Sequence, residues 1–276
     1  MTTHPAPGGG DGLAADAPDD GPLVRREDAG GVATLTLNRP RSRNALSLAM
    51  LEALGAQLAA AEADPSVRVV VLAGEGPAFS AGHDLREIAA TDDASEHLRL
   101  FRTCSAVMQQ VVGLRQPVIA QVGGVATAAG CQLVASCDLA VAGESARFAT
   151  PGVNIGLFCS TPAVAVSRAL APKHTLQLLL TGELIGADDA FRMGLVNEVV
   201  PDGELAAAAR RLAERLASKP AAVIAAGKAA LRRQLGLSLA DAYADASQAM
   251  ADGLARPDAA EGIGAFLDKR PPTWRS

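Results

Sequence analysis

The sequence contains few aromatic residues and little positive charge, and each shortage excludes a class of function. Phe, Trp and Tyr make up 3% of the 276 residues, so we expect no platform of aromatic side chains that stacks on nucleic-acid bases. The formal net charge is −5, which argues against the basic face that nucleic-acid-binding proteins need. No apolar run in the sequence reaches the ~20 residues that a membrane-spanning helix requires.

The sequence also lacks paired cysteines. None of its four cysteines belongs to a CxxC pair or clusters with histidines at zinc-ligand spacing; they are Cys104, Cys131, Cys137 and Cys159. We therefore expect no metal site. The pattern favours buried, reduced thiols in a reducing compartment.

The N-terminal residues 1–22 have neither the apolar centre of a secretory signal nor the arginines of a transit peptide. Gly, Pro, Ala and Asp dominate this segment, and such a composition buries too little apolar surface to fold. We therefore predict a disordered tail over residues 1–22. From the same observations we expect a cytoplasmic protein that binds no membrane and no nucleic acid.

The rest of the chain alternates expected strands and helices. Hydrophobic residues make up 49% of the whole sequence, which is enough for a sizeable core. The patterns predict strands and helices in turn: a strand over 32–37, a helix over 46–63 capped by Ser47, a buried strand over 67–72, a helix over 95–112 and a strand from 118. This repeat indicates an α/β fold of stacked strand–strand–helix units, with the chemistry in the loops between them.

After Val200 the patterns predict only helices. They span 204–217, 221–235 and 239–254. We therefore divide the ordered chain into a core over 23–202 and a C-terminal helical region over 203–276. This second region is expected to pack on the core or on a neighbouring subunit.

Two loops rich in small residues precede expected helix starts. They are 78–85, AFSAGHDL, and 123–131, GGVATAAGC. Small side chains let a ligand approach the backbone, and a helix N-terminus offers free N–H donors whose dipole favours negative charge. Two such loops facing each other can bind an oxyanion, although small residues also serve close helix packing. In the first loop, Asp84 and Glu87 have the spacing of a capping box.

The two loops and their neighbours resemble the enoyl-CoA hydratase/isomerase family, also called the crotonase superfamily. The matching segments, spread over roughly residues 24 to 272, are NRPRSRNALS, AFSAGHDL, VGGVATAAGCQLVASCDLAVA, FATPGVNIGL, LLTGELIGADDAFRMGLVNEVVP and FLDKRPPTW. Within the family, ATAAGCQLVASCD and FATPGVNIGLFCSTP most resemble the branch called enoyl-CoA hydratase domain-containing protein 3. The resemblance implies a crotonase spiral of ββα units with C-terminal helices that assemble a homotrimer or a dimer of trimers.

The resemblance also implies an acyl-CoA substrate, with coenzyme A present only as part of that substrate and no separate cofactor. The oxyanion hole would be the backbone N–H groups of His83 and Ala129, flanked by Gly82 and Gly130. Coenzyme A would contact a further set of residues: Arg43, Ala45, Leu46, Ala81, Phe266, Lys269 and Arg270. For Lys269 and Arg270 the physical argument is positive charge near phosphate, and a solvated basic tail is the alternative.

The sequence departs from the family pattern where hydratases carry their two catalytic glutamates. Those positions are Gln132 and Gly152, and Ser160 stands where some relatives place a third acid. Glutamine hydrogen-bonds water but cannot take its proton, and glycine has no side chain. General acid–base catalysis typically contributes about 10²–10⁴ in rate, so we expect slow hydration even with an intact oxyanion hole. Restoring both acids, Gln132→Glu with Gly152→Glu, is expected to raise hydration.

Three functions stay open from the sequence. The first is an enoyl-CoA hydratase or isomerase of fatty-acid and acyl-CoA metabolism. The second is another enolate reaction, such as decarboxylation of an acyl-CoA, in which the substrate's own carboxylate leaves. The third is a non-catalytic binder of CoA thioesters. The His83 imidazole is a conceivable base, and Cys159 and Ser160 are expected near the acyl pocket.

Overall fold

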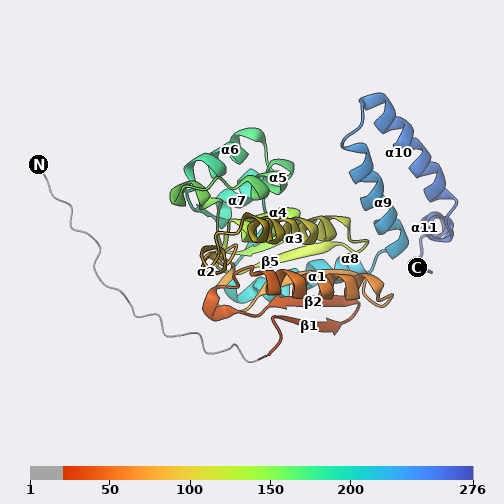
Figure 1. Cartoon of the computed structure of the whole chain (residues 1–276). Helices are drawn as coiled ribbons and strands as arrows, with labels where there is room; N and C mark the ends of the chain where they lie inside the picture. The colour runs from red at the N-terminus through yellow and green to blue at the C-terminus, as the bar shows by residue number, and fades with distance from the viewer. Residues whose placement is uncertain (1–20, 276) are drawn as a thin grey trace, which may run out of the picture.

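The computed structural model describes residues 21–275, and within them the strands form two sheets (Figure 1). The predicted tail lies outside the described residues except for Gly21 and Pro22. The larger sheet has the strand order β1 (Val24–Ala29), β2 (Val32–Leu37), β3 (Val69–Gly74), β5 (Val118–Val122), β7 (Leu139–Gly143) and β10 (Glu198–Val200). The smaller sheet has the order β4 (Ala78–Ser80), β6 (Val125–Thr127), β8 (Arg147–Ala149) and β9 (Ile185–Gly186).

The chain builds both sheets at once, from units of two strands followed by a helix. In each unit the first strand joins the larger sheet and the second joins the smaller one: β3 with β4, β5 with β6, and β7 with β8. Neighbouring strands from successive units run parallel, whereas β1 and β9 pair antiparallel at the edges. This is the spiral of ββα units that the resemblance implies, and the two loops that are expected to carry the chemistry follow the short strands β4 and β6.

Helices cover both faces of the larger sheet. The helices are α1 (Leu48–Ala63), α2 (Leu85–Ala89), α3 (Ala94–Gly113), α4 (Ala129–Ser136), α5 (Ser160–Ala169), α6 (Pro172–Thr181), α7 (Ala187–Met193), α8 (Leu205–Ala217), α9 (Ala221–Gln234), α10 (Leu239–Leu254) and α11 (Pro257–Leu267), with short 3-10 turns at Pro40–Ser42, Pro151–Ile155 and Asp202–Glu204. Side chains from α1 and α3 pack on one face, and α8 packs on the other. The uninterrupted apolar run of β3 is explained by this burial on both faces.

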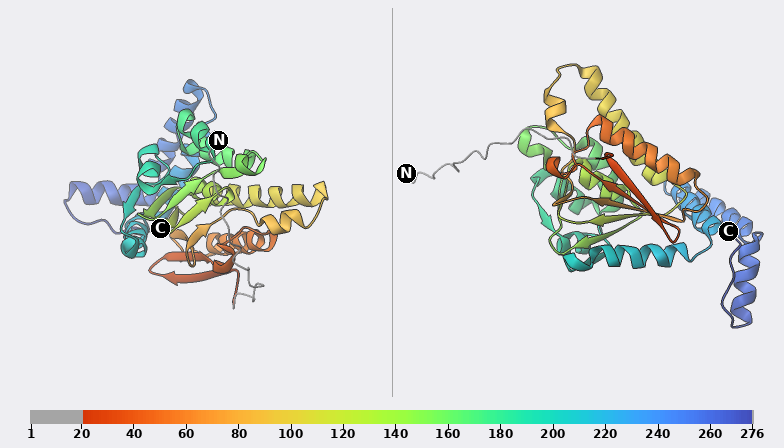
Figure 2. Two further views of the ribbon diagram at one scale, coloured as in Figure 1. Left: turned by 90° about the vertical axis from the view of Figure 1, so that its left-hand side faces the viewer. Right: turned by 90° about the horizontal axis from the view of Figure 1, so that it is seen from below.

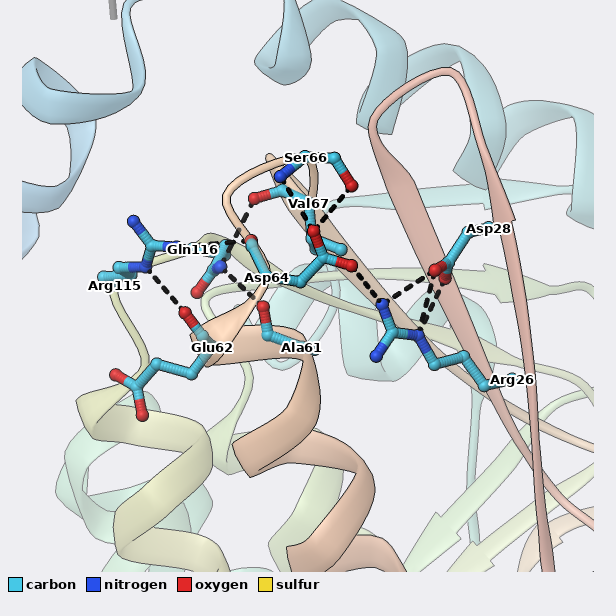
Figure 3. Close-up of polar contacts among 9 residues, drawn as sticks. All are labelled: Arg26, Asp28, Ala61, Glu62, Asp64, Ser66, Val67, Arg115 and Gln116. Carbon is cyan, nitrogen blue, oxygen red and sulfur yellow. Dashed lines mark hydrogen bonds and ion pairs between the residues drawn. The ribbon is translucent and has the colours of Figure 1, made fainter.

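A polar cluster ties the amino end of β3 to the end of α1, away from the loops of interest (Figure 3). Asp64 ends α1, accepts hydrogen bonds from the Ser66 amide at 2.9 Å and hydroxyl at 2.7 Å, and pairs with Arg26. These Ser66 hydrogen bonds are the main cause that lowers the pKa of Asp64. Gln116 donates to the carbonyl oxygens of Ala61 and Val67, so the segment just before β5 is held to the same corner.

The C-terminal helices α9, α10 and α11 extend away from the body of the molecule (blue in Figures 1 and 2). They are fixed to it by Lys228 and Arg232, which both pair with Asp138 just before β7. In contrast, α8 belongs to the core by its packing, although it lies within the predicted helical region 203–276. The apolar groove between α9, α10 and α11 contains none of the residues predicted for the site.

Candidate active site

The first loop runs beside the turn that the resemblance assigns to coenzyme A. The Ala81 amide donates to the Arg43 carbonyl at 2.9 Å, and the Leu46 amide donates to the Gly82 carbonyl at 2.7 Å. The Ser80 hydroxyl also donates to the Asn44 carbonyl at 2.9 Å. These bonds fix Arg43, Ala45 and Leu46 next to Ala81 and Gly82, so the structure brings the predicted residues of this part of the site together.

Asn44 is a positioning residue that sequence reasoning missed. Its buried side chain donates to the carbonyls of Glu75 (2.9 Å) and Ala78 (2.7 Å) and accepts from the Arg39 amide (2.8 Å). Arg43 and Asn44 both have positive φ, 50° and 52°, and asparagine is enriched in this conformation. The signal available in the sequence was therefore an asparagine between Arg43 and the small Ala45.

The second loop turns sharply into α4 at Ala128. This residue has φ 50° and ψ −117°, outside the allowed regions of ordinary L-residues, and its amide is held by the Ala149 carbonyl at 2.9 Å. Strain of this kind costs of order 1–3 kcal/mol and is typical of functional sites. The turn makes Ala129 the first residue of α4, where the helix offers an amide without an intrahelical partner.

The two loops touch, and glycine at two positions is what lets them touch. A Cβ atom on Gly130 would lie 2.2 Å from the Ser80 carbonyl oxygen. A Cβ on Gly82, which has φ +93°, would lie 2.8 Å from the Ala128 Cβ and 3.2 Å from the Ala129 nitrogen. No side chain fits at either distance without movement, so Gly82 and Gly130 bring the loop of His83 against the start of α4.

Within residues 21–275, the backbone N–H groups of His83 and Ala129 donate to no other protein group. The amides that precede them are used: those of Ala81 and Ala128 donate to main-chain carbonyls, and that of Gly82 donates to the Ser80 hydroxyl. Two free amides on touching loops, one of them at a helix N-terminus, are the elements of an anion-binding site.

The His83 side chain lies away from its own amide, against Leu46 and Phe101. Its Nδ1 atom is 3.2 Å from the Leu46 carbonyl oxygen, and its ring meets the Phe101 ring edge-on at 5.3 Å. Because the carbonyl only accepts, Nδ1 carries the proton and Nε2 holds a lone pair. Nε2 is buried without a hydrogen-bond partner among the described residues. Burial lowers the pKa of His83, so the ring is neutral at pH 7.

Asp84 and Glu87 cap two different helices. Asp84 is the N-cap of α2, where it accepts from the Arg86 amide at 3.1 Å, and it also pairs with Arg39. Glu87 accepts from the Leu48 amide at 3.0 Å, at the start of α1. The two residues therefore do not form the reciprocal capping box that their spacing predicts. Instead, Glu87 caps α1, because α1 starts close to α2.

Gln132 is buried one turn into α4. Its side chain is 3% exposed, and its Oε1 atom has no hydrogen-bond partner among residues 21–275. The Thr150 hydroxyl, just before Gly152, is buried in the same unpartnered state. Cys131, adjacent to Gln132, is fully buried, and burial is the first cause that raises its pKa to about 12. This cysteine is therefore an inert, neutral thiol at pH 7.

Gly152 has no room for a side chain. A Cβ atom there would lie 2.1 Å from the Leu157 carbonyl oxygen and 2.8 Å from the Cys159 sulfur. On this backbone, Gly152→Glu is therefore not expected to help to restore hydration. The loop 157–159 has closed over the position, and a glutamate would have to displace main chain.

Four further predicted residues lie outside the two loops. Ser160 is exposed at the start of α5, and its hydroxyl lies 3.4 Å from the Phe158 carbonyl. Phe266, 82% exposed, and Lys269 lie at the end of α11, on the projecting helices. Arg270, also on this segment, pairs with Glu261. The C-terminal segment of a chain therefore lies on its projecting helices and not at the loops of His83 and Ala129 of the same chain (Figure 1).

Other classes of site find no support in the described part of the chain. Residues 21–275 contain no group of three or more His, Cys, Asp or Glu side chains that could hold a metal ion. No helix among them is long and apolar enough to cross a membrane.

Comparison with known proteins gives the context of this geometry. A rat (Rattus norvegicus) relative named enoyl-CoA hydratase domain-containing protein 3, mitochondrial, is 48% identical over 251 residues, which are 91% of this chain and 83% of the relative. A crystal structure of an enoyl-CoA hydratase from Mycobacterium smegmatis superposes with a TM-score of 0.90 at 50% identity, covering 93% of this chain and 100% of that one. The human domain-containing protein 3 structure gives 0.89 at 46% identity, covering 92% and 100%.

The same relatives correct the expected compartment. The rat, mouse, frog, human and zebrafish proteins of this branch are all named as mitochondrial, so the prediction of a cytoplasmic protein is wrong. The physical reason is that import depends on a targeting segment, whereas the composition of a folded core is the same in either compartment.

The model of the family described as enoyl-CoA hydratase/isomerase matches residues 27–276, nearly the whole described chain. This match agrees with the ββα spiral, and the relatives named above agree with the branch that the sequence most resembles. The chain therefore belongs to the enoyl-CoA hydratase/isomerase family.

Proposed function

We propose that this protein binds an acyl-CoA thioester and stabilises its enolate with the amides of His83 and Ala129. The observation that carries the proposal is that both amides are free while they lie on loops in direct contact. The thioester carbonyl oxygen accepts both hydrogen bonds, which strengthen as negative charge develops on it. One such donor is typically worth about 10²–10³ in rate.

The rest of the second loop supports the same role. The strained backbone of Ala128 starts α4 at Ala129, so the helix dipole favours charge on the bound oxygen. Because the donors are main-chain groups held by Gly82 and Gly130, they are in place before substrate arrives. Preorganised donors of this kind cost no reorganisation during the reaction.

Coenzyme A is held by two parts of the chain in this proposal. Arg43, Ala45, Leu46 and Ala81 hold its bent pantetheine end, next to the oxyanion loops. The adenine and phosphate end is held by Phe266 and Lys269 of a neighbouring copy, since α9 to α11, at whose end these residues lie, extend away from the body of their own chain (Figure 2). The proposed assembly is thus a homotrimer or a dimer of trimers, and a light-scattering mass equal to one chain would contradict it.

The reaction is limited by neutral side chains at the positions assigned to the two glutamates. Gln132 cannot take a proton from water, and Gly152 has no side chain, so hydration of an enoyl-CoA is slow. The proposed activity is therefore the enoyl-CoA hydratase or isomerase chemistry of the family, in acyl-CoA metabolism. In this protein we expect the reaction to run at a low rate.

The same neutrality favours a second function, decarboxylation of a malonyl-type thioester. There the bond between the α carbon and the carboxylate breaks, CO₂ leaves, and the electron pair becomes the enolate held in the oxyanion hole. A proton from solvent then adds to the α carbon. A substrate carboxylate meets no like charge from Gln132 or Gly152, which is the observation that favours this reaction.

Binding and turnover assays separate these functions from a non-catalytic binder. The purified full chain is mixed with crotonyl-CoA and with malonyl-CoA, and loss of the enoyl absorbance and release of CO₂ are followed. Binding with slow hydration, with or without CO₂ release, is the expected result. Hydration at the ~10 s⁻¹ typical of enzymes would contradict the role given to Gln132 and Gly152. Binding without either reaction would identify a non-catalytic binder.

A further inference from the structure

The second loop carries a single hydroxyl group, on Thr127, among small apolar residues. The other residues of 123–131 are all Gly, Ala, Val or Cys. Thr127 is the last residue of β6, and its half-buried side chain donates from Oγ1 to the Ala81 carbonyl at 3.1 Å. Because Ala81 belongs to the first loop, this hydrogen bond joins the loop of His83 to the loop of Ala129.

The bond lies where the pairing of β4 with β6 ends. The two strands run parallel, and their last paired residues are Ser80 and Ala126. Beyond this pair both chains leave the strand conformation, since Gly82 has φ +93° and Ala128 has φ 50°. The Thr127 hydroxyl therefore continues the contact between the two chains at the point where their main-chain pairing stops.

The peptide group between Ala81 and Gly82 is held at both ends by hydroxyls. The Ala81 carbonyl accepts from Thr127, and the Gly82 amide donates to the Ser80 hydroxyl at 3.3 Å. A trans peptide group is planar, so a bond at each end fixes its orientation. The next peptide group along the chain bears the His83 amide, which therefore follows a fixed segment of the backbone.

The peptide groups that bear the two free amides are each held at their carbonyl. The Gly82 carbonyl accepts from the Leu46 amide at 2.7 Å, and the Ala128 carbonyl accepts from the Gln132 amide at 3.0 Å. In a trans peptide group the N–H points opposite to the C=O, so these bonds fix the direction of each free N–H. They do not by themselves fix the separation of the two N–H groups, because each acts on one loop.

We propose that Thr127 is a positioning residue whose hydroxyl sets the separation of the two amides in the oxyanion hole. Thr127 and Ala81 each lie two residues before a donor, Ala129 and His83, so their hydrogen bond fixes the two donors relative to each other. The glycines of the two loops permit the close approach, and the Thr127 hydroxyl holds it. The inference rests on the proposed function, because it concerns the oxygen that both amides bind.

Substitutions that remove or keep the hydroxyl test the inference. Thr127→Val keeps the β-branched shape and removes the donor, whereas Thr127→Ser keeps the donor. In Thr127→Val the two amides no longer bind one oxygen together, so crotonyl-CoA affinity should fall about three- to tenfold. Affinity for coenzyme A, which has no thioester carbonyl, should change less than about twofold. Thr127→Ser should bind both ligands like the wild type, and calorimetric titration measures all of these affinities.

The thioester carbonyl of bound crotonyl-CoA reports on the amides themselves. Its infrared band shifts to lower frequency when the oxygen accepts hydrogen bonds, and this shift should be smaller in Thr127→Val than in the wild type and in Thr127→Ser. The matched control is Thr175→Val in α6, outside the two loops. Thr175 is buried, and its hydroxyl donates to the Leu170 carbonyl at 3.4 Å. This control should leave the band and both affinities unchanged.

The outcomes separate the inference from the function beneath it. A purely structural role would lower the stability of Thr127→Val and leave the carbonyl band in place, and that result would overturn the inference. Equal losses of affinity for crotonyl-CoA and coenzyme A would also overturn it. A wild-type protein that binds no crotonyl-CoA, or binds it without a shift of the band, would instead contradict the proposed function. If Thr127→Val does not fold, Thr127→Ala removes the same hydroxyl with a smaller side chain, and the same results decide.

Discussion

The two sides of the candidate site differ in how they are built. One side consists of main-chain amides, those of His83 and Ala129, held by glycines and by a strained alanine. The other side consists of Gln132, Gly152 and Cys159, and none of these carries an acid. Under the proposed function, proton transfer and stabilisation of the oxyanion therefore depend on separate parts of the site.

The separation has a physical origin. Backbone donors depend on loop geometry, so they tolerate side-chain change as long as Gly82 and Gly130 remain. Acid–base catalysis depends instead on a carboxylate at each of two positions, and a single substitution removes one of them. A chain of this family can therefore keep enolate stabilisation while its reaction changes.

The largest effect is expected from forcing the two loops apart. In Gly130→Ala the new Cβ meets the Ser80 carbonyl at 2.2 Å, so the start of α4 must move away from Gly82. Loss of one or both hydrogen bonds to the thioester should weaken acyl-CoA binding by about 10–100-fold. Calorimetric titration against crotonyl-CoA measures this.

The matched control is Gly113→Ala at the end of α3, where a Cβ meets nothing within 4 Å. It should bind crotonyl-CoA like the wild type and unfold within about 1 kcal/mol of it. Unchanged binding by a folded Gly130→Ala protein would show that the loop contact does not hold the amides in place.

The next effect separates the two positions assigned to glutamate. Gln132→Glu places a buried carboxylate on α4, three residues after Ala129, and burial raises its pKa toward the range of a general acid, so crotonyl-CoA hydration should rise about 10²-fold. Gly152→Glu should give no increase and should lower stability by about 1–3 kcal/mol or more, because it displaces the Leu157 carbonyl.

The loss of enoyl absorbance measures the hydration rate of these two variants, and denaturant unfolding measures their stability. Gln109→Glu, the same chemical change on the exposed face of α3, serves as the control and should leave hydration unchanged. Faster hydration by Gly152→Glu would mean that the loop 157–159 opens easily, against the closed structure described here.

A smaller effect concerns the side chain of His83 as distinct from its amide. The folded-state pKa of His83 is lowered by burial, so the unfolded chain binds a proton first as the pH falls below about 6.5. The free energy of unfolding is therefore not reduced by His83 above about pH 6.5. As the pH falls from there toward the folded-state pKa, it decreases by up to about 1.4 kcal/mol per pH unit.

In His83→Leu this contribution disappears, so the stability curve between pH 5 and about 6.5 becomes flatter, as measured by urea unfolding at several pH values. The variant keeps its amide, and its affinity for crotonyl-CoA at pH 7.5 should change little. Identical pH slopes for both proteins would contradict the buried, neutral imidazole.

The smallest effect is expected at Ser160. Its hydroxyl is exposed and lies near the Phe158 carbonyl, so Ser160→Ala should change stability by less than about 0.5 kcal/mol and leave acyl-CoA turnover unchanged. Thermal unfolding and the two turnover assays check this. A large loss of turnover would give Ser160 a catalytic role that the described geometry does not support.

The sequence predicted the long elements better than the short ones. The alternating VATLTL segment predicted β2, and Ser47 is the N-cap of α1 as expected. The smaller sheet could not be predicted, because β4, β6 and β8 have three residues each and show no periodicity. The helix α11 was missed as well, since Pro257 reads as a break although it stands at the first turn of that helix.

The site was predicted where it depends on local composition and missed where it depends on long-range contact. Small residues and the resemblance pointed to the loops of His83 and Ala129. No local signal predicts a positive φ at Ala128, because alanine rarely adopts it. Likewise, the closure of Leu157 and Cys159 over Gly152 is a tertiary contact that side-chain identity alone does not reveal.

The most direct test of the account removes the amide hydrogen of Ala129 and leaves every side chain unchanged. Replacing Ala129 by its hydroxy acid, lactic acid, turns the amide into an ester, and infrared difference spectroscopy then follows the thioester carbonyl of bound crotonyl-CoA. The same exchange at Ala135, inside α4, is the control. We predict that the carbonyl band shifts to lower frequency in the wild type and in the Ala135 ester, and that most of this shift is lost in the Ala129 ester. An equal shift in all three proteins would contradict the proposed oxyanion hole.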